Sequence, residues 1–348
     1  MDKKELYQYV GSMQQMVYIR KVTCEEGRST GLRMFDVKNE CLQYQVMCDK
    51  CLDVAGFSYK GINMNFLSKP GLQGRNHYDT NGQEALRSIM GGLFFTAGME
   101  NICAPNETGE YPMHGRIRTT PAGEVSSSQE WTKDGLVLKV SGTMREAELF
   151  GENMVLRRSI ESVAGSKSIK VIDEIENEAY RDEPLMLLYH INLGYPFLTP
   201  AMKFYIPTKK VTPRDEASKG HEDRYDRMDK PKKNEPEYVF IHDMKKTKDK
   251  KTWVLAVNPD LKLGLKIQFN MKNLPYFMEW KSTAAGDYVI GLEPSNSSVY
   301  GRGYHEKNGD LHMLKPFEKE KNELVFTVLD GDEEIQAAVE EFDKQLNQ

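Results

Sequence analysis

Hydrophobic and polar residues alternate in several short runs along the chain. The most regular run is 263–269, where Leu263, Leu265, Ile267 and Phe269 alternate with Gly, Lys and Gln. Runs with the same period lie at 42–46, 136–140, 169–175 and 324–328, and Asp173 interrupts the third of these. A period of two residues is typical of antiparallel sheets with one buried and one solvated face. Turn residues separate the runs, so the chain is predicted to be mostly β.

Helical spacing is rare in the sequence. Hydrophobic residues at 335, 339, 342 and 346, with acids at 332–334 in the first turn, predict a C-terminal helix. Short helices are also predicted near 5–10 and 83–90. The sequence contains no internal repeat and no Gly-, Ser- or Pro-rich linker, so residues 1–348 are expected to form one large sandwich domain of antiparallel sheets.

The composition argues against nucleic acid and membrane as partners. The 348 residues are 39% hydrophobic and 28% charged, with a net charge of −5. No stretch is long and apolar enough to span a bilayer, and the acidic balance gives no general attraction for nucleic acid or anionic lipid. Residues 1–7 do not resemble a secretion signal, so we expect a cytoplasmic protein.

The cysteines predict neither disulfides nor a metal site. Five cysteines, without an export signal, indicate reduced thiols. Cys48 and Cys51 have CxxC spacing, but the sequence has no second pair to complete a zinc site. We interpret the spacing as coincidence, and we predict no bound metal.

Three motifs contain candidate catalytic residues. The first is Met113-His114-Gly115-Arg116, in a turn that begins at Pro112. The planar guanidinium of Arg116 can hold two oxygens of a polyhydroxylated ligand. On the structural alternative, His114 only satisfies backbone groups of its loop.

The second motif contains His190, which follows the apolar run 185–189. Asn192 lies two residues further on and shares its strand face. Two polar groups on one face of an apolar strand predict a polar pocket, because a buried histidine without partners destabilises a fold. A core histidine with satisfied hydrogen bonds is the structural alternative.

The third motif contains Glu293, between the apolar run 288–292 and Pro294. A carboxylate is seldom buried without a partner, so we expect Glu293 at the mouth of a pocket. A salt bridge to Arg302 or Lys281 is the structural alternative. The remaining histidines are expected at the surface or in loops; they are His77, His221, His242, His305 and His312.

In their order along the chain, these motifs resemble the aldose 1-epimerase (galactose mutarotase) superfamily, and within it a bacterial branch without an assigned function. The similarity covers about residues 17–331. Its landmarks are Gly91-Gly92-Leu93-Phe94, Ala97-Gly98-Met99-Glu100-Asn101, His114-Gly115-Arg116-Ile117, Phe150-Gly151-Glu152, Asp173-Glu174-Ile175-Glu176-Asn177, Tyr189-His190-Ile191-Asn192-Leu193-Gly194-Tyr195-Pro196, Pro213-Arg214-Asp215, Leu274-Pro275, Glu279-Trp280-Lys281 and Gly291-Leu292-Glu293-Pro294.

The resemblance implies a galactose mutarotase-like β-supersandwich: large antiparallel sheets, few short helices and an open sugar site. It also implies that His114, His190 and Glu293 correspond to the family's two histidines and its glutamate. In this chain Tyr189 precedes His190, and Asn192 follows it after only two positions.

The expected reaction is the interconversion of the α and β anomers of a free sugar. Glu293 would remove the proton of the anomeric hydroxyl, His190 would protonate the ring oxygen, and His114 would hold the sugar. Because the reaction moves only protons, no metal or organic cofactor is expected. The expected substrate contacts are Arg116, Asn192, Trp280, Lys281 and Arg302, with Tyr189 and Tyr195 as alternatives to Trp280 for stacking.

Two other functions remain open at this stage. A lyase or isomerase of a uronic, keto- or modified sugar on the same scaffold could use Tyr111, Arg116 and Arg302. A non-catalytic sugar-binding protein would need no acid–base set. The sequence names neither the sugar nor the oligomeric state.

Overall fold

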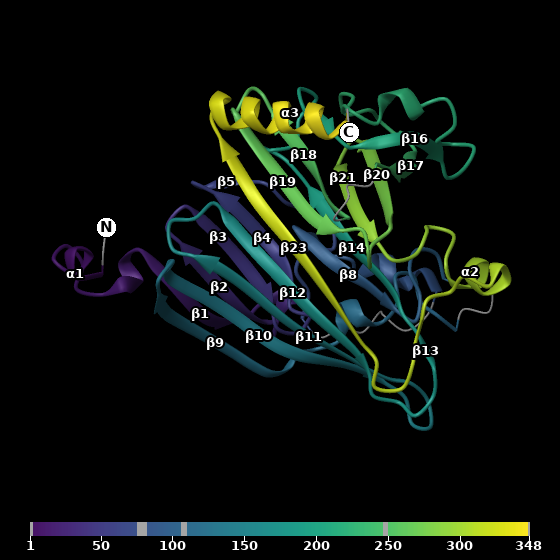
Figure 1. Ribbon diagram of the computed structural model, residues 1–348, viewed down its shortest axis with the longest axis horizontal. Helices are drawn as coiled ribbons and strands as arrows, with labels where there is room; N and C mark the ends of the chain where they lie inside the picture. The colour runs from purple at the N-terminus through teal and green to yellow at the C-terminus, as the bar shows by residue number, and fades with distance from the viewer. Residues whose placement is uncertain (1–2, 75–81, 106–109, 246–249, 347–348) are drawn as a thin grey trace.

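The alternating runs form strands of two large antiparallel sheets that pack face to face (Figure 1). The computed structural model describes residues 3–74, 82–105, 110–245 and 250–346. The predicted mostly β fold is confirmed, and the five alternating runs lie in β3, β10, β12, β19 and β23.

The first sheet has eleven strands in the order β1-β2-β3-β4-β8-β14-β21-β20-β17-β16, with β5 paired to β4. Their bounds are β1 Val17–Thr23, β2 Arg33–Asn39, β3 Leu42–Met47, β4 Asp53–Tyr59, β5 Ile62–Asn63, β8 Phe94–Met99, β14 Met186–Leu193, β16 Thr208–Pro213, β17 Glu237–Met244, β20 Tyr276–Ala284 and β21 Asp287–Ser295.

The second sheet has eight strands in the order β15-β18-β19-β23-β12-β11-β10-β9. Their bounds are β9 Gly123–Thr132, β10 Gly135–Ala147, β11 Asn153–Val163, β12 Ser168–Asn177, β15 Lys203–Tyr205, β18 Lys251–Asn258, β19 Leu263–Asn270 and β23 Lys319–Asp330. Two small sheets pair β6 Phe66–Leu67 with β7 Gly91–Gly92, and β13 Glu183–Pro184 with β22 Met313–Leu314.

Helices are few, as expected. The predicted C-terminal helix is confirmed as α3, Asp332–Leu346, which packs Phe342 against Trp253 of the second sheet. The predictions near 5–10 and 83–90 were less accurate, because the chain forms only α1, Lys3–Leu6, and the 3-10 helix η3, Gly82–Arg87. The other helices are η1 Met13–Gln15, η2 Gly27–Ser29, η4 Ile117–Thr119, η5 Glu222–Arg224 and α2 Arg302–Asn308.

Asp173 breaks the hydrophobic pattern of β12 because it takes part in a buried charge network between the two sheets. The guanidinium of Arg158 donates to Asp173 at 2.6 and 2.7 Å and to Asp53 at 2.6 Å, and all three side chains are fully buried. Tyr189 donates its hydroxyl to Asp173 at 2.7 Å. Tyr189 therefore faces the core and is excluded from stacking on a substrate, which corrects that expectation.

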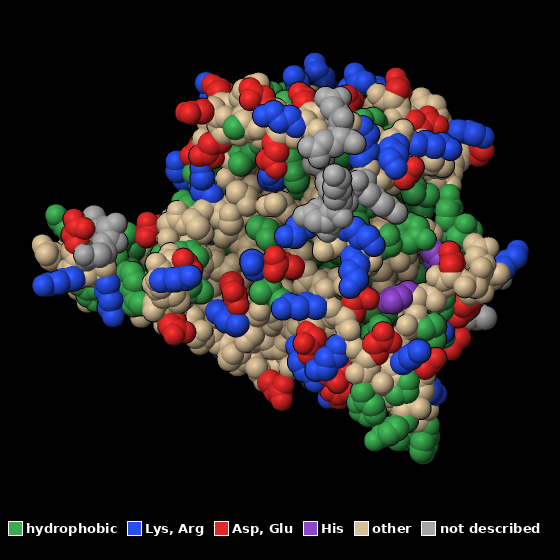
Figure 2. Space-filling view, in the orientation of Figure 1, with side chains coloured by type: hydrophobic (Ala, Val, Ile, Leu, Met, Phe, Trp, Pro, Cys, Tyr) green, Lys and Arg blue, Asp and Glu red, His purple; other side chains and the backbone are tan. Residues whose placement is uncertain are grey.

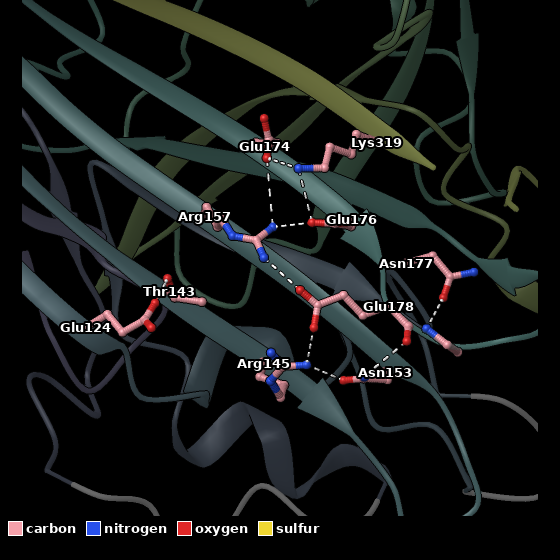
Figure 3. A network of polar contacts seen from close by, with 11 residues as sticks. Glu124, Thr143, Arg145, Asn153, Arg157, Glu174, Glu176, Asn177, Glu178 and Lys319 are labelled. Atoms are coloured by element: carbon pink, nitrogen blue, oxygen red, sulfur yellow. Dashed lines mark hydrogen bonds and ion pairs between the residues drawn. The ribbon is translucent and has the colours of Figure 1, made fainter. Parts of the chain in front are cut away.

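The outer face of the second sheet carries a row of ion pairs (Figure 3). Arg157 bonds Glu176 at 2.6 Å and Glu178 at 2.7 Å, and Lys319 bonds Glu174 at 3.0 Å. These pairs keep this face hydrophilic. The outer face of the first sheet instead carries a separate apolar cluster that includes Phe95, Leu188 and Met278. The candidate site lies on that face.

Candidate active site

His190 and Glu293 lie opposite each other on the paired strands β14 and β21. The register pairs Leu188 with Ser295 and Ile191 with Leu292, which places His190 across from Glu293. Their side chains point to the outer face of the sheet, and the His190 Nε2 and Glu293 Oε1 atoms are 3.1 Å apart. Both are buried, with exposed fractions of 7% and 3%. Two residues about 100 positions apart in the sequence thus form one acid–base pair.

Gly291 makes room for this pair. A Cβ atom at this position would lie 2.4 Å from Glu293 Oε1 and 3.1 Å from His190 Cε1. The first distance is shorter than a Cβ atom tolerates and the second is tight, so a side chain at position 291 would displace the Glu293 carboxylate from its place beside His190.

His114 completes the group from a loop that follows β8. Its ring lies edge-on to the rings of His190 and Phe95, with centroid distances of 5.4 and 5.5 Å. Gly115 allows this close approach, since a Cβ there would lie 1.9 Å from the carbonyl oxygen of Gly98. The backbone N–H of Cys103 donates to His114 Nδ1 at 3.3 Å. The neutral ring therefore carries its proton on Nε2, where it can donate to a ligand.

Burial shifts the pKa values of all three groups toward their neutral forms. Burial lowers the pKa of His190 to about 4 and raises the pKa of Glu293 to about 8, against an opposing effect of the Arg214 charge. The pKa of His114 is also lowered, first by burial and then by His190 and Arg118. Between about pH 4 and pH 8 the His190–Glu293 pair therefore holds one proton.

The pair also has unused hydrogen-bonding capacity. Although His190 Nε2 and Glu293 Oε1 are close, their alignment does not make a hydrogen bond, and within the described residues Glu293 Oε1 and His190 Nδ1 have no partner. A buried polar atom without a partner costs about 1–3 kcal/mol. A ligand hydroxyl at this position would remove that cost.

Arg214 and Glu237 form one wall of the site together with Trp280, and the sequence did not predict either of the two as a substrate contact. Arg214 bonds Glu237 at 3.1 Å, and the Trp280 indole N–H donates to the other oxygen of Glu237 at 2.8 Å. Trp280 in turn lies beside His190, with ring centroids 5.3 Å apart. The Pro213-Arg214-Asp215 motif was visible in the sequence, but only the strand pairing brings Arg214 beside Val239 and Trp280.

The structure brings some of the expected substrate contacts to the pair. Trp280 lies next to His190. Asn192 is on the same strand and donates to the backbone carbonyl of His190 at 2.7 Å, so it is positioned to brace the strand. Tyr195, the sequence-based alternative to Trp280 for stacking, has 76% of its surface exposed.

Arg116 and Arg302 lie elsewhere. Both line a cavity of about 440 Å³ together with Tyr111 and the carboxyl groups of Glu100 and Glu146. Arg116 forms an ion pair with Glu100 at 3.0 Å, and the Arg302 guanidinium lies 4.4 Å from the centre of the Tyr111 ring. We therefore do not assign them to the His190–Glu293 site.

Lys281 also requires correction, because it lies on the opposite face of β20 from Trp280. Its ammonium group is 2.9 Å from Glu279 and donates to the carbonyls of Arg224 and Arg227 at 2.8 and 2.9 Å. Successive side chains of a strand point to opposite faces of the sheet, so Lys281 cannot share the face of Trp280.

Two of the histidines that were expected at the surface are buried. His242 lies 3.3 Å from Glu279, and His305 bonds Ser298 and Asp310 at 2.9 Å each. A carboxylate contacts His242, and a hydroxyl and a carboxylate contact His305; these contacts depend on how the chain folds, so local sequence did not reveal them. His221 and His312 are half-buried, and His77 lies outside the described residues.

The described part of the chain contains no group of three or more His, Cys, Asp or Glu residues that could hold a metal ion. All five cysteines are free thiols, and Cys48 and Cys51 are both buried. Among the described residues, no helix combines the length and hydrophobicity needed to cross a membrane.

Comparison with known proteins identifies the family and the fold of this chain. A sequence family described as a domain of unknown function, DUF4432, matches residues 29–328. The chain belongs to the DUF4432 family. None of the curated proteins matches it in sequence.

Solved structures share the fold of this DUF4432 member. A proposed aldose 1-epimerase from Klebsiella pneumoniae is 21% identical, with a TM-score of 0.87 over 94% of this chain and 87% of the other. A galactose mutarotase-like protein from Clostridium acetobutylicum is 14% identical, with a TM-score of 0.65 over 91% and 99%. A galactose 1-epimerase from Lactobacillus acidophilus is 14% identical, with a TM-score of 0.57 over 90% and 99%. The expected galactose mutarotase-like fold is thus confirmed.

Proposed function

We propose that this protein interconverts the α and β anomers of a free sugar by general acid–base catalysis at His190 and Glu293. The observation that carries the proposal is the buried pair itself, with Nε2 and Oε1 3.1 Å apart and pKa values displaced to about 4 and about 8. Mutarotation needs one group with a proton and one without, and this pair holds a single proton at neutral pH.

The reaction then proceeds by two matched proton transfers. The unprotonated group removes the proton of the anomeric hydroxyl while the protonated group donates to the ring oxygen. The bond between the anomeric carbon and the ring oxygen breaks, and a carbonyl forms. After rotation about the neighbouring carbon–carbon bond, the same steps run in reverse and close the ring on the other face.

The resting protonation refines the assignment of the two roles. The displaced pKa values favour a resting state with the proton on Glu293, whereas the sequence-based mechanism placed it on His190. Moving this proton from Glu293 to His190 leaves the net charge of the pair unchanged. The two assignments, Glu293 as base with His190 as acid and the reverse, therefore differ only in which residue carries the proton. The Nε2–H of His114 would stabilise the developing charge on a sugar oxygen.

The neighbouring aromatic and charged side chains suit a sugar. The half-buried Trp280 indole offers a stacking surface for the C–H face of a sugar ring, and the Arg214–Glu237 pair offers donors and acceptors for hydroxyls. A lyase would draw on Tyr111, Arg116 and Arg302, which line the other cavity, so we do not include that activity.

Anomer exchange measured by NMR on a panel of freshly dissolved hexoses, pentoses, deoxy sugars and uronic acids tests the proposal. We expect acceleration for at least one sugar, and a loss of about 10²–10⁴-fold in Glu293→Gln. Glu235→Gln, a surface carboxylate that pairs with Lys232, is the control and should keep full activity. No acceleration with any sugar of the panel, or full activity in Glu293→Gln, would rule the mechanism out.

Thermal unfolding separates a lost function from a lost fold. The pKa of Glu293 is raised from 4.5 to about 8 in the folded protein, so its contribution to stability declines as pH rises through that window. Glu293→Gln has no charge to bury. Its melting temperature should therefore equal or exceed that of the wild type, by an increasing margin toward pH 8.

A further inference from the structure

Hydrophobic side chains gather at one end of the molecule, where three loops meet. The loops join β10 to β11, β12 to β13 and β22 to β23. Their exposed apolar residues are Leu149 (82% exposed), Phe150 (93%), Tyr180 (91%) and Phe317 (50%), and Met313 (41%) lies beside them at the start of β22. Figure 2 shows hydrophobic side chains at this end, at its lower right. We call these five residues the apolar tip.

Backbone hydrogen bonds fix the loop that carries Phe150. The N–H of Gly151 donates to Glu148 O at 2.9 Å, and the N–H of Glu148 donates to Glu152 O at 3.1 Å. Arg181, from the neighbouring loop, donates to Phe150 O at 3.4 Å. The phenylalanine ring is therefore held outward by an ordered turn.

Asn177 ties the other two loops together. Its side-chain amide donates to Arg181 O at 2.8 Å and Leu314 O at 2.9 Å, and its oxygen accepts from Ala179 N at 2.9 Å. Its backbone carbonyl accepts from Phe317 N at 2.7 Å. The rings of Tyr180 and Phe317 contact each other edge-on at 5.1 Å. This arrangement presents the apolar side chains as one preformed surface, with little room to fold them inward.

Two of the aromatic residues have unusual backbone conformations. Phe150 has a φ of +64° and Phe317 a φ of +61°. Glycine or asparagine is favoured in this region, and a bulky residue there is destabilising. Bulky rings at both positions indicate that the rings contribute something other than stability of the loops.

The size of the apolar tip matches an interface. One fully exposed aromatic side chain can bury about 150–250 Å². Three of the five residues are aromatic and two of the five are only about half exposed, so together they offer roughly 600 Å² of apolar surface. That is at the upper limit of the patches found on monomeric proteins. A stable interface needs about 800 Å² from each partner, which this surface and its rim would supply.

The charges around the apolar tip identify its partner. The rim carries the acids Glu148, Glu152, Asp182 and Glu318 and the bases Arg181 and Lys315. This excess of acid disfavours an anionic lipid surface. A rim with both signs can complement itself across a twofold axis, since each residue then meets a different residue of the second copy. We propose that the apolar tip is the contact surface of a twofold dimer of this chain.

Size-exclusion chromatography with light scattering, over about 1–100 μM protein, tests the dimer. The wild type should elute as a dimer, and the double variant Phe150→Ser/Tyr180→Ser should raise the dissociation constant at least about 100-fold. Tyr9→Ser, which replaces a 74% exposed aromatic near the N-terminus, is the control and should leave the dimer intact.

The variant should fold normally, because the replaced rings are exposed in the single chain. An unchanged melting temperature at low protein concentration checks this. A wild type that is monomeric throughout the concentration range, or a double variant that still dimerises, would overturn the proposal. So would a monomer whose apolar tip binds vesicles of mixed phosphatidylcholine and phosphatidylserine and loses that binding in the double variant.

Discussion

At the scale of single residues, burial determines the protonation of the candidate pair. His190 and Glu293 are exposed by less than a tenth, and in each of them burial favours the neutral form. Neither shift could be derived from local sequence, because each depends on the strands and loops that cover the side chain. The residue types were nevertheless identifiable from their motifs.

The pH dependence of activity follows from these shifts. Below about pH 4 the imidazole of His190 gains a proton and the pair has no base, whereas above about pH 8 Glu293 loses its proton and the pair has no acid. We expect a bell-shaped plot of kcat/KM against pH, with its acidic limb near pH 4 and its alkaline limb near pH 8. Anomer exchange measured across the pH range checks this, and a flat profile between pH 3 and pH 10 would contradict the pair as catalyst.

Gly291 gives a second test at this scale. In Gly291→Ala the new methyl group would overlap Glu293 Oε1 and displace the carboxylate, so kcat should fall by about 10²-fold or more. Gly303→Ala is the matched control, because no atom lies within 4 Å of a Cβ there and alanine suits its helix. Equal activity of the two variants would show that the position of Glu293 is not critical.

At the scale of elements, strand pairing brings together Arg214, Glu237 and Trp280, which form one wall of the site. Arg214 follows β16, Glu237 begins β17 and Trp280 lies in β20, and the three side chains form one hydrogen-bonded chain. The order of strands in the first sheet, β21-β20-β17-β16, decides that these residues adjoin Glu293. Alternation in the sequence predicted the strands but gave no order for them.

Arg214→Ala tests this wall. We expect KM to rise about 10-fold or more, since a hydrogen bond to a charged group contributes about 1.5–3 kcal/mol. The Arg214 charge also lowers the pKa of Glu293, so its removal should move the alkaline limb of the pH profile to higher pH. A purely structural role would leave that limb in place.

Arg224→Ala is the matched control, because Arg224 pairs with Asp229 in the loop between β16 and β17, away from the pair. It should change neither KM nor the alkaline limb. If both arginine variants behaved alike, the wall would have no specific role in binding.

At the scale of the whole molecule, the two sheets are joined by an apolar core and by a buried charge network. Arg158 from the second sheet reaches Asp53 of the first, and Tyr189 of the first reaches Asp173 of the second. His190 is the neighbour of Tyr189 on β14, so the network supports the strand that carries the candidate catalytic histidine.

Arg158→Ala should destabilise the protein by about 3–5 kcal/mol, because it leaves two buried carboxylates without their cation. Arg157→Ala, one residue away, removes exposed ion pairs on the outer face of the same strand and should cost about 0–1 kcal/mol. Urea unfolding of both variants measures the difference. Comparable losses would contradict the role of the buried network.

The sequence by itself determined the mostly β class, the C-terminal helix, the galactose mutarotase-like fold and the residue types of the candidate pair. The class and the helix follow from local periodicity, whereas the fold was implied by the resemblance of the motifs to those of a known superfamily. The tertiary structure decided which candidates meet: it joined His190 to Glu293, added Arg214, turned Lys281 and Tyr189 to other faces, and placed Arg116 and Arg302 at another cavity. The reason is physical, because contacts between distant strands and the burial that shifts pKa values depend on which strands become neighbours in a sheet, and strand order is a non-local property.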